Sequence, residues 1–504
     1  MFIPKQKQIS RCGSGRAQEL QRWFSAVFVF VLLVSAAGQD AGGNAGTNQP
    51  GARIVSTNPA PTQNIETPSL PPSVIEQLQE QSPLTNQIGV TPSQPPALGP
   101  ATLGAAPPTA AIMGTSTLSG PPSTFGAGKA GPGIPLWGPI NIHPHLVYTF
   151  TYGNGIDAQP GKQGNTAINT VTPGVLINVG KQWSLDYSPT FSYYSSPGFN
   201  NTMDEAVTLR GNWTSENWVF GLSQSYSSSS QPLIETGIQT EQEAYATALT
   251  ASYQMGSELS LQLGLNQNFR DAEGDVQAST NVPPLTDLHE WTGNGWLDYQ
   301  AGKMFGMAMG LILGYDKVDP GSDMPYEQLQ GKINFHPGPK LTLTLSGGVE
   351  DRQFTGPSAP SLISPIFNGS LQYQIFQPTT IIINASRTTT PSFLTNAEVQ
   401  VSTSFSGSIR QQLSKKLSLE GDASYSTTPY TGIETAMVGF HFGNAPALQV
   451  VRNDTTTSYR ISLAYNIVER ASLSIFYSLS DNTSSQSGFG YSSRQIGLSL
   501  SYQY

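Results

Sequence analysis

The sequence has a single cysteine, few charges and no long apolar run, and each shortage excludes a class of protein. Cys12 is the one cysteine among 504 residues, so a disulfide framework and a Cys-ligated metal centre are excluded. Charged residues make up 11% of the chain, against about 25% in typical soluble domains. No apolar stretch has the roughly 20 residues that a membrane-spanning helix needs.

Residues 1–38 have the three parts of a secretory signal peptide. A basic stretch is followed by an apolar run from Phe24 to Val34 and then by small residues, including Ala36, Ala37 and Gly38. We expect cleavage in this small-residue region, which would remove Cys12 and leave no thiol in the mature chain. The alternative is an uncleaved N-terminal helix that anchors the protein.

The chain that follows this signal is acidic. It holds 19 Lys+Arg against 32 Asp+Glu, because residues 1–38 carry five basic residues and one acidic residue. Such a balance argues against nucleic acid and anionic membrane surfaces as partners.

Residues 39–136 are of low complexity and rich in Pro, Gly, Ala, Ser and Thr. A stretch with so few aromatic residues cannot bury enough apolar surface to offset the entropy cost of ordering it. We therefore predict a disordered periplasmic extension. The alternative is a segment that enters the following domain as a plug or binds a partner.

Residues 137–504 alternate between amphipathic segments and two kinds of connection, one very short and one long and polar. Short periplasmic turns and long extracellular loops are typical of a transmembrane antiparallel up-and-down β-barrel. This all-β fold is expected to have about 18 strands, within a range of about 16–20, and residues 428–454 leave room for one more hairpin around 436–442. The expected strands are 140–152, 166–179, 183–194, 204–213, 217–226, 241–255, 258–269, 287–301, 304–316, 326–336, 340–352, 366–376, 379–389, 396–413, 416–427, 455–467, 470–480 and 491–504.

Period-two alternation predicts which face of each strand meets lipid. In the last segment Ile496, Leu498, Leu500, Tyr502 and Tyr504 share one face, and polar or small residues share the other. A soluble β-sandwich has the same alternation with its apolar face inward. Strand length and the aromatics near strand ends favour the membrane barrel. Those aromatics are Tyr193, Tyr194, Trp213, Trp218, Trp291, Trp296 and Tyr465.

The last ten residues match the C-terminal assembly signal of outer-membrane proteins. The signal comprises a polar residue, a glycine two positions on, hydrophobic positions and an aromatic end. An amphipathic strand of this kind can pair with an edge of the assembly machinery. The matching residues are Gln495, Gly497, Leu500, Tyr502 and Tyr504.

The closing segments 465–477 and 493–502 resemble the final hairpin of β-barrel porins that occur with exopolysaccharide or protein-sorting export systems of Gram-negative bacteria. The resemblance is good over about the last 50 residues. Elsewhere it is limited to the regular succession of strands and connections. It implies an outer-membrane location and a channel, and it supplies no binding residues.

Residues with catalytic or metal-binding chemistry are sparse. His143 and His145 share one face of the first expected strand, but a metal site would need a further ligand that the sequence does not indicate. Asp316, Asp319 and Asp323 fall in one expected loop, and Asp271, Glu273 and Asp275 in another, without the spacing of a calcium loop. We therefore expect no enzyme activity, no metal and no cofactor.

The sequence thus predicts an outer-membrane barrel that forms a porin-like or export-associated channel for small solutes or polysaccharide. The acidic excess is compatible with a mild preference for cations or with neutral solutes. The expected partners are outer-membrane lipid and lipopolysaccharide, the outer-membrane assembly machinery and exopolysaccharide export components. The alternative is a non-conducting barrel whose extracellular loops bind a ligand or a surface polymer.

Overall fold

A computed structural model describes residues 134–137, 140–154, 164–230, 239–274, 285–355, 360–392, 399–433 and 448–504. Among these residues no helix has the length and apolarity needed to cross a membrane. All regular structure in them is β, in strands that mostly run 12 to 17 residues. The strands are β1 (Ile134–Trp137), β2 (Ile140–Asn154), β3 (Thr166–Val179), β4 (Trp183–Tyr187), β5 (Thr190–Tyr194), β6 (Thr202–Ser215), β7 (Trp218–Ser229), β8 (Thr240–Gln254), β9 (Leu259–Gly274), β10 (Asp287–Ala301), β11 (Phe305–Asp319), β12 (Met324–Gly338), β13 (Leu341–Gln353), β14 (Ser361–Phe376), β15 (Thr379–Pro391), β16 (Val399–Gln412), β17 (Leu417–Ile433), β18 (Leu448–Val468), β19 (Ala471–Ser484) and β20 (Tyr491–Gln503).

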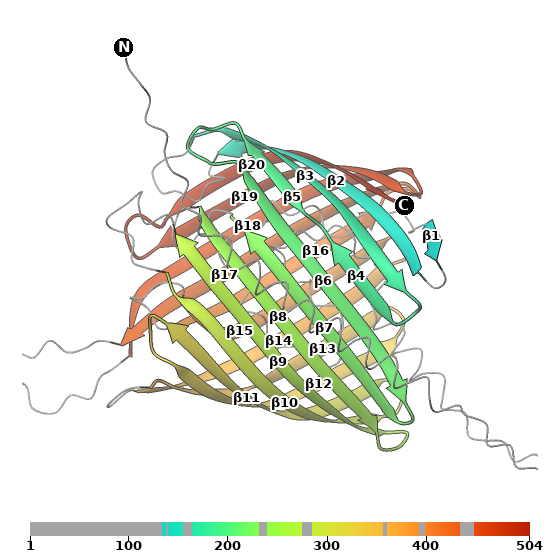
Figure 1. Cartoon of the computed structure of the whole chain (residues 1–504), viewed down its shortest axis with the longest axis vertical. Helices are drawn as coiled ribbons and strands as arrows, with labels where there is room; N and C mark the ends of the chain where they lie inside the picture. The colour runs from blue at the N-terminus through green and yellow to red at the C-terminus, as the bar shows by residue number, and fades with distance from the viewer. Residues whose placement is uncertain are drawn as a thin grey trace, which may run out of the picture. The chain divides into compact units, whose positions relative to one another are not determined.

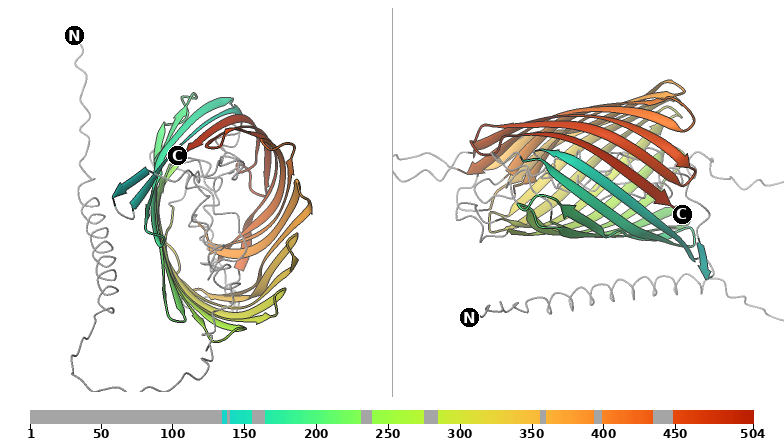
Figure 2. Two further views of the ribbon diagram at one scale, coloured as in Figure 1. Left: turned by 90° about the vertical axis from the view of Figure 1, so that its right-hand side faces the viewer. Right: turned by 90° about the horizontal axis from the view of Figure 1, so that it is seen from above.

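The strands form one closed antiparallel barrel. Neighbours in the chain pair in order, and β20 closes the ring by pairing with β2 from His145↔Gln503 to Asn154↔Arg494. Seen from its end, the ring is complete (Figure 2). Because β4 and β5 share one place between β3 and β6, the barrel has 18 strand positions, which confirms the expected number.

The first short strand lies outside this ring. β1 pairs with the start of β2, opposite Ile140 to Ile142, near the end at which Tyr504 lies (Figure 1). It begins just before the boundary expected at residue 137. The remainder of the predicted extension 39–136, and the predicted signal with its cleavage region Ala36–Gly38, fall outside the described residues.

One expected strand, 183–194, is interrupted. Tyr187 pairs with Val175 and Phe191 with Val171, so the register is the same on both sides of the break. Pro189 lies in the break and has no N–H to donate to a ladder. The interruption is therefore local. Residues 428–433 and 448–454, where a further hairpin was considered, extend β17 and β18, whereas 436–442 lies outside the described residues.

The apolar face of the strands points outward, as the alternation predicts. In β20 Ile496 and Tyr502 are 51% and 44% exposed, whereas Gln495 and Ser499 are each 4% exposed. The exposed apolar side chains form the lipid-facing surface, and the polar face lines the interior.

Aromatic rings form a row on the outer surface near each end of the strands. At the end with short turns, Trp213 stacks on Phe220 with ring centroids 5.2 Å apart, and the ring of Trp218 lies tilted against that of Tyr253 at 4.8 Å. At the other end Trp291 lies 5.3 Å from the ring of Phe269. Trp296, which was expected in such a row, instead points inward and is buried, because it occupies the polar-face positions of β10.

Candidate functional site: the inner wall and its mouth

The inner wall of β18–β20 is built from hydroxyl groups that bond to one another. The Oγ atoms of Ser458 and Ser480 are 3.0 Å apart, and those of Ser472 and Ser501 are 2.6 Å apart. Across the closing ladder, Thr149 donates to Ser499 at 3.1 Å. Short hydroxyl side chains at alternate positions thus give a neutral, polar surface on which several hydroxyl groups bond to one another in pairs.

The ionised groups of the inner wall lie beside groups of opposite charge. Near the end with long loops, Arg352 of β13 pairs with Asp316 of β11 and with Glu350, whose Oε1 lies 2.9 Å from the arginine Nε. Its guanidinium also lies over the ring of Tyr326, 4.4 Å from the centroid, and the Tyr326 hydroxyl donates to Glu290 at 2.6 Å. These groups are almost fully buried, so each compensates for the lost hydration of its neighbours.

The same pairing recurs elsewhere on the inner wall. Lys332 Nζ lies 3.4 Å from Asp298 and 5.2 Å from the centroid of Trp296. Arg452 pairs with Asp454, and Arg460 lies within electrostatic reach of Asp422. The pairing depends on register, because most partners come from different strands or from alternate positions of one strand. The sequence alone did not indicate it.

Large inward-facing rings lie opposite glycine. Trp296 pairs with Gly310, and a Cβ on this glycine would approach the indole Cδ2 within 2.3 Å. Tyr326 covers Gly314, and Phe476 covers Gly497 in the same way. Gly497 is part of the predicted assembly signal, and the structure gives it a packing role within the finished barrel. Gln495, Gly497, Leu500 and Tyr502 lie on β20 between β19 and β2, and Tyr504 follows the strand directly. Recognition by the assembly machinery stays a prediction.

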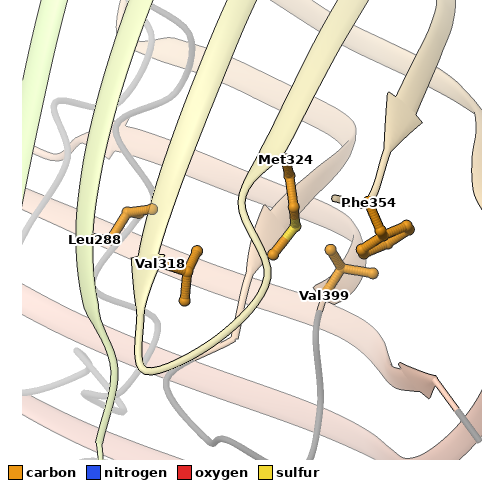
Figure 3. Close-up of a cluster of buried hydrophobic side chains, with 5 residues drawn as sticks. All are labelled: Leu288, Val318, Met324, Phe354 and Val399. Atoms are coloured by element: carbon orange, nitrogen blue, oxygen red, sulfur yellow. The ribbon is translucent and has the colours of Figure 1, made fainter. Parts of the chain in front are cut away.

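At the end with long loops an apolar cluster lies on the otherwise polar inner side. It consists of Leu288, Val318, Met324 and Phe354, from β10 to the end of β13, together with Val399 from β16. Figure 3 shows the five side chains facing a common region. Val399 and Met324 are both fully buried. Since β14 and β15 separate β13 from β16 in the sheet, this contact is not made through the ladder.

A second contact joins the same two parts of the barrel. The hydroxyl of Thr286, just before β10, donates to the carbonyl of Ser392, just after β15, at 2.8 Å. The end of the β15–β16 pair therefore leans inward over the mouth of the barrel and rests on β10–β13. We call Leu288, Val318, Met324 and Phe354 the seat. No sequence pattern predicted the seat, because apolar residues at single inward positions look like irregular alternation.

The predicted histidines do share the inner face, near the end with short turns. His143 Nδ1 lies 3.2 Å from the carbonyl oxygen of Tyr504, and His145 Nε2 lies 3.1 Å from Ser188 Oγ. The Ser188 hydroxyl donates to Asp186 at 2.7 Å, so it is not donated to His145. Because the Ser188 proton points to Asp186, His145 is not placed to remove it as a general base. Within the described residues, no group of three or more His, Cys, Asp or Glu is placed to hold a metal ion.

The two acidic groups singled out as possible calcium loops are arranged differently from the expectation. Asp316 lies within β11 and faces inward to Arg352, because β11 continues to Asp319, so the three aspartates do not share one loop. Asp323 accepts a hydrogen bond from Tyr315 at 2.6 Å. Asp271 lies within β9, 3.4 Å from His289, Glu273 belongs to the same strand, and Asp275 lies outside the described residues.

A closed barrel with a lipid-facing exterior and a polar, charge-paired interior defines a porin-like channel fold of the outer membrane. Residues 324–504 match the model of the family described as "Putative beta-barrel porin 2". This match confirms the resemblance to β-barrel porins that the closing segments indicate, and it extends the resemblance back to β12. No curated protein matches the chain.

Solved structures with similar folds are outer-membrane porins and receptors of Pseudomonas aeruginosa. OccK11 (OpdR) is 12% identical, with 72% of this chain and 95% of that chain covered and a TM-score of 0.36. The outer membrane protein opdK is 13% identical, with coverages of 72% and 98% and a TM-score of 0.39. The ferric enterobactin receptor PfeA is 9% identical, with coverages of 72% and 80% and a TM-score of 0.40. Likenesses this distant carry no functional residue over to this chain.

Proposed function

We propose that this barrel is a channel for small neutral polar solutes of the carbohydrate class. The observation that supports the proposal is the pairing of charges on the inner wall. A carboxylate beside a cation, as in Asp298–Lys332, contributes little net field to the passage. A wall without net field favours neither cations nor anions.

The neutral lining supports the same solute class. Serine, threonine, asparagine and glutamine side chains make up most of the polar inner positions, and they offer hydrogen bonds without charge. Part of the acidic excess of the chain lies outside the passage. Glu243, Asp271 and Glu327 occupy the outward-facing positions of their strands. The neutral-solute alternative of the sequence is therefore favoured over the cation preference.

The other functional expectations from the sequence concern catalysis, adhesion and binding partners. A transport role without catalysis is favoured, since the matching family is described as a porin. A non-conducting barrel with adhesive loops is the less favoured candidate. Lipopolysaccharide, the assembly machinery and exopolysaccharide export components are proposed as partners, the last on the resemblance of the closing segments alone.

The test is the ion selectivity of the refolded protein in a planar lipid bilayer. Under a KCl gradient we expect a steady open current with a reversal potential close to zero. Lys332→Gln leaves Asp298 without its cation, so the reversal potential is expected to move toward that of K⁺. Sugar uptake in liposome-swelling assays is expected for the unmodified protein.

Lys317→Gln is the matched control. Lys317 occupies an outward-facing position of β11, so this variant loses the same charge without changing the inner wall. Its reversal potential should equal that of the unmodified protein. A strongly cation- or anion-selective unmodified channel would contradict the neutral-solute proposal, and the absence of current and of sugar uptake would contradict the channel itself.

A further inference from the structure

We propose that the end of the β15–β16 pair is a gate, held closed over the mouth by the insertion of Val399 into the seat. This inference rests on the proposed channel function and adds a movable element to it. Three features of the described residues support it: the apolar seat, the burial of the inserted segment together with a second contact beside it, and a break in the ladder that carries this segment.

The first feature is the apolar character of the seat. Inner-wall positions on both sides of it are polar or charged, as at Glu290 and Asp316. Leu288, Val318 and Met324 occupy the corresponding inward positions nearer the mouth. Exposed to a water-filled passage, these side chains would be unfavourable, so their presence is explained by an apolar group that covers them. Val399, which is fully buried, is that group.

The second feature is the burial of four consecutive residues of β16. Val399, Gln400, Val401 and Ser402 are all buried, whereas a strand of the barrel wall alternates between an exposed and a covered side. Both faces of this strand end are therefore covered. This strand end keeps its pairing with β15, and with β17 at Val399 and Gln400, and it bends inward over the mouth, where the Thr286–Ser392 hydrogen bond also holds it.

The third feature is a break in the ladder where a hinge would be needed. β16 pairs with β17 continuously from Gln412 to Thr403, and pairing resumes only at Gln400↔Tyr430. The intervening part of β17 contains Pro429, which cannot donate a backbone hydrogen bond. Fewer ladder bonds fix the strand end to the wall at this point, so it can bend with little loss of pairing.

The gate has two states with a simple energetic difference. In the closed state the apolar contact between Val399 and the seat is made, together with the Thr286–Ser392 hydrogen bond. In the open state both are lost and the seat meets water. A solute or a change in the loops that releases this contact would widen the passage, whereas the wall of the barrel stays unchanged.

The test combines conductance with chemical labelling of the full-length protein. Val399→Asp places a carboxylate in the apolar cluster and should release the strand end, so we expect single-channel conductance to rise about twofold. Ser404→Asp is the matched control. It adds the same charge to the inner face of the same strand, opposite Ser386 and outside the seat, so it measures the effect of an added inner-wall charge alone. The conductance of Val399→Asp should exceed that of Ser404→Asp about twofold.

Labelling reports on the contact independently of conduction. In a Cys12→Ser background, Val399→Cys should react with a water-soluble maleimide at least about tenfold more slowly than Ser414→Cys, which lies exposed in a short turn. Equal labelling rates would overturn the closed contact. A protected Val399→Cys with unchanged conductance in Val399→Asp would overturn the gate.

The failure of the channel itself has a distinct pattern. No current from the unmodified protein or from Val399→Asp, with Val399→Cys still protected, would overturn the proposed channel and the gate with it. Heat-modifiable gel migration of each variant shows that the barrel has folded, so a lost current cannot be attributed to misfolding.

Discussion

Single residues on the inner wall are selected by what lies directly across the ladder from them. Trp296, Tyr326 and Phe476 each cover a glycine on the next strand, and a Cβ on that glycine would collide with the ring. Glycine in a strand has a cost in conformational entropy. Glycine is therefore required at these positions by the space that the ring occupies, and not by a preference of the backbone. Sequence alternation alone predicted an inward position for Gly497 but gave no reason for glycine there.

A prediction at this scale concerns Gly310. The new methyl group in Gly310→Ala would lie about 2.3 Å from the Trp296 ring, so the indole must move within a well-packed cluster. We expect a loss of about 1–3 kcal/mol in the free energy of unfolding. Urea unfolding in detergent or lipid, followed by tryptophan fluorescence, measures it.

Gly331→Ala is the control for this effect. Gly331 lies on the neighbouring β12 with its nearest atom, the Ala308 carbonyl oxygen, 3.9 Å from the position of a Cβ. The added methyl group has room there, so the unfolding midpoint should not fall. Equal destabilisation by both changes would mean that the ring of Trp296 is not the cause.

At the scale of elements, the strands follow the alternation of the sequence, and the strand expected at 183–194 is interrupted beside a proline. β4 and β5 keep a common register with β3 and β6 and are separated at Ser188–Pro189. The strand expected at 183–194 was therefore right in extent, and it contains a break that was not expected. Pro189 removes one donor from the ladder, but its presence did not predict the break, because Pro144 and Pro173 lie within unbroken strands.

The corresponding prediction is that Pro189→Thr joins β4 and β5. Threonine supplies the missing N–H and is a good strand former, so we expect a gain of about 0.5–1 kcal/mol in the free energy of unfolding. Hydrogen exchange should show slower exchange at Ser188 and Thr190. Thr190→Ser, which leaves Pro189 in place, should not slow the exchange, and unchanged rates in Pro189→Thr would argue that the break has another cause.

The whole molecule is held together by closure of the ring. β20 joins β2 through a ladder from His145↔Gln503 to Asn154↔Arg494, so no strand of the ring keeps a free edge in the lipid. Closure makes unfolding cooperative, since opening one seam exposes unpaired backbone groups along its length. The prediction at this scale is therefore about the intact barrel.

We expect the folded protein to migrate ahead of the boiled protein in SDS gels. The closed ladder resists SDS at room temperature and keeps the chain compact until heating separates the strands. A chain truncated before β20 cannot close onto β2, and it is the control that should migrate identically with and without boiling. Identical migration of the full-length protein would contradict a closed barrel.

The sequence by itself determined the strand order, the strand number and the face that meets lipid. These follow from period-two alternation and from turn residues, which act between near neighbours in the chain. The tertiary structure alone decided which carboxylate meets which cation and where Val399 is inserted. Partners such as Asp298 and Lys332, or Leu288 and Val399, come together only after the register, closure and bending of the sheet are set, and none of these is encoded in a local pattern.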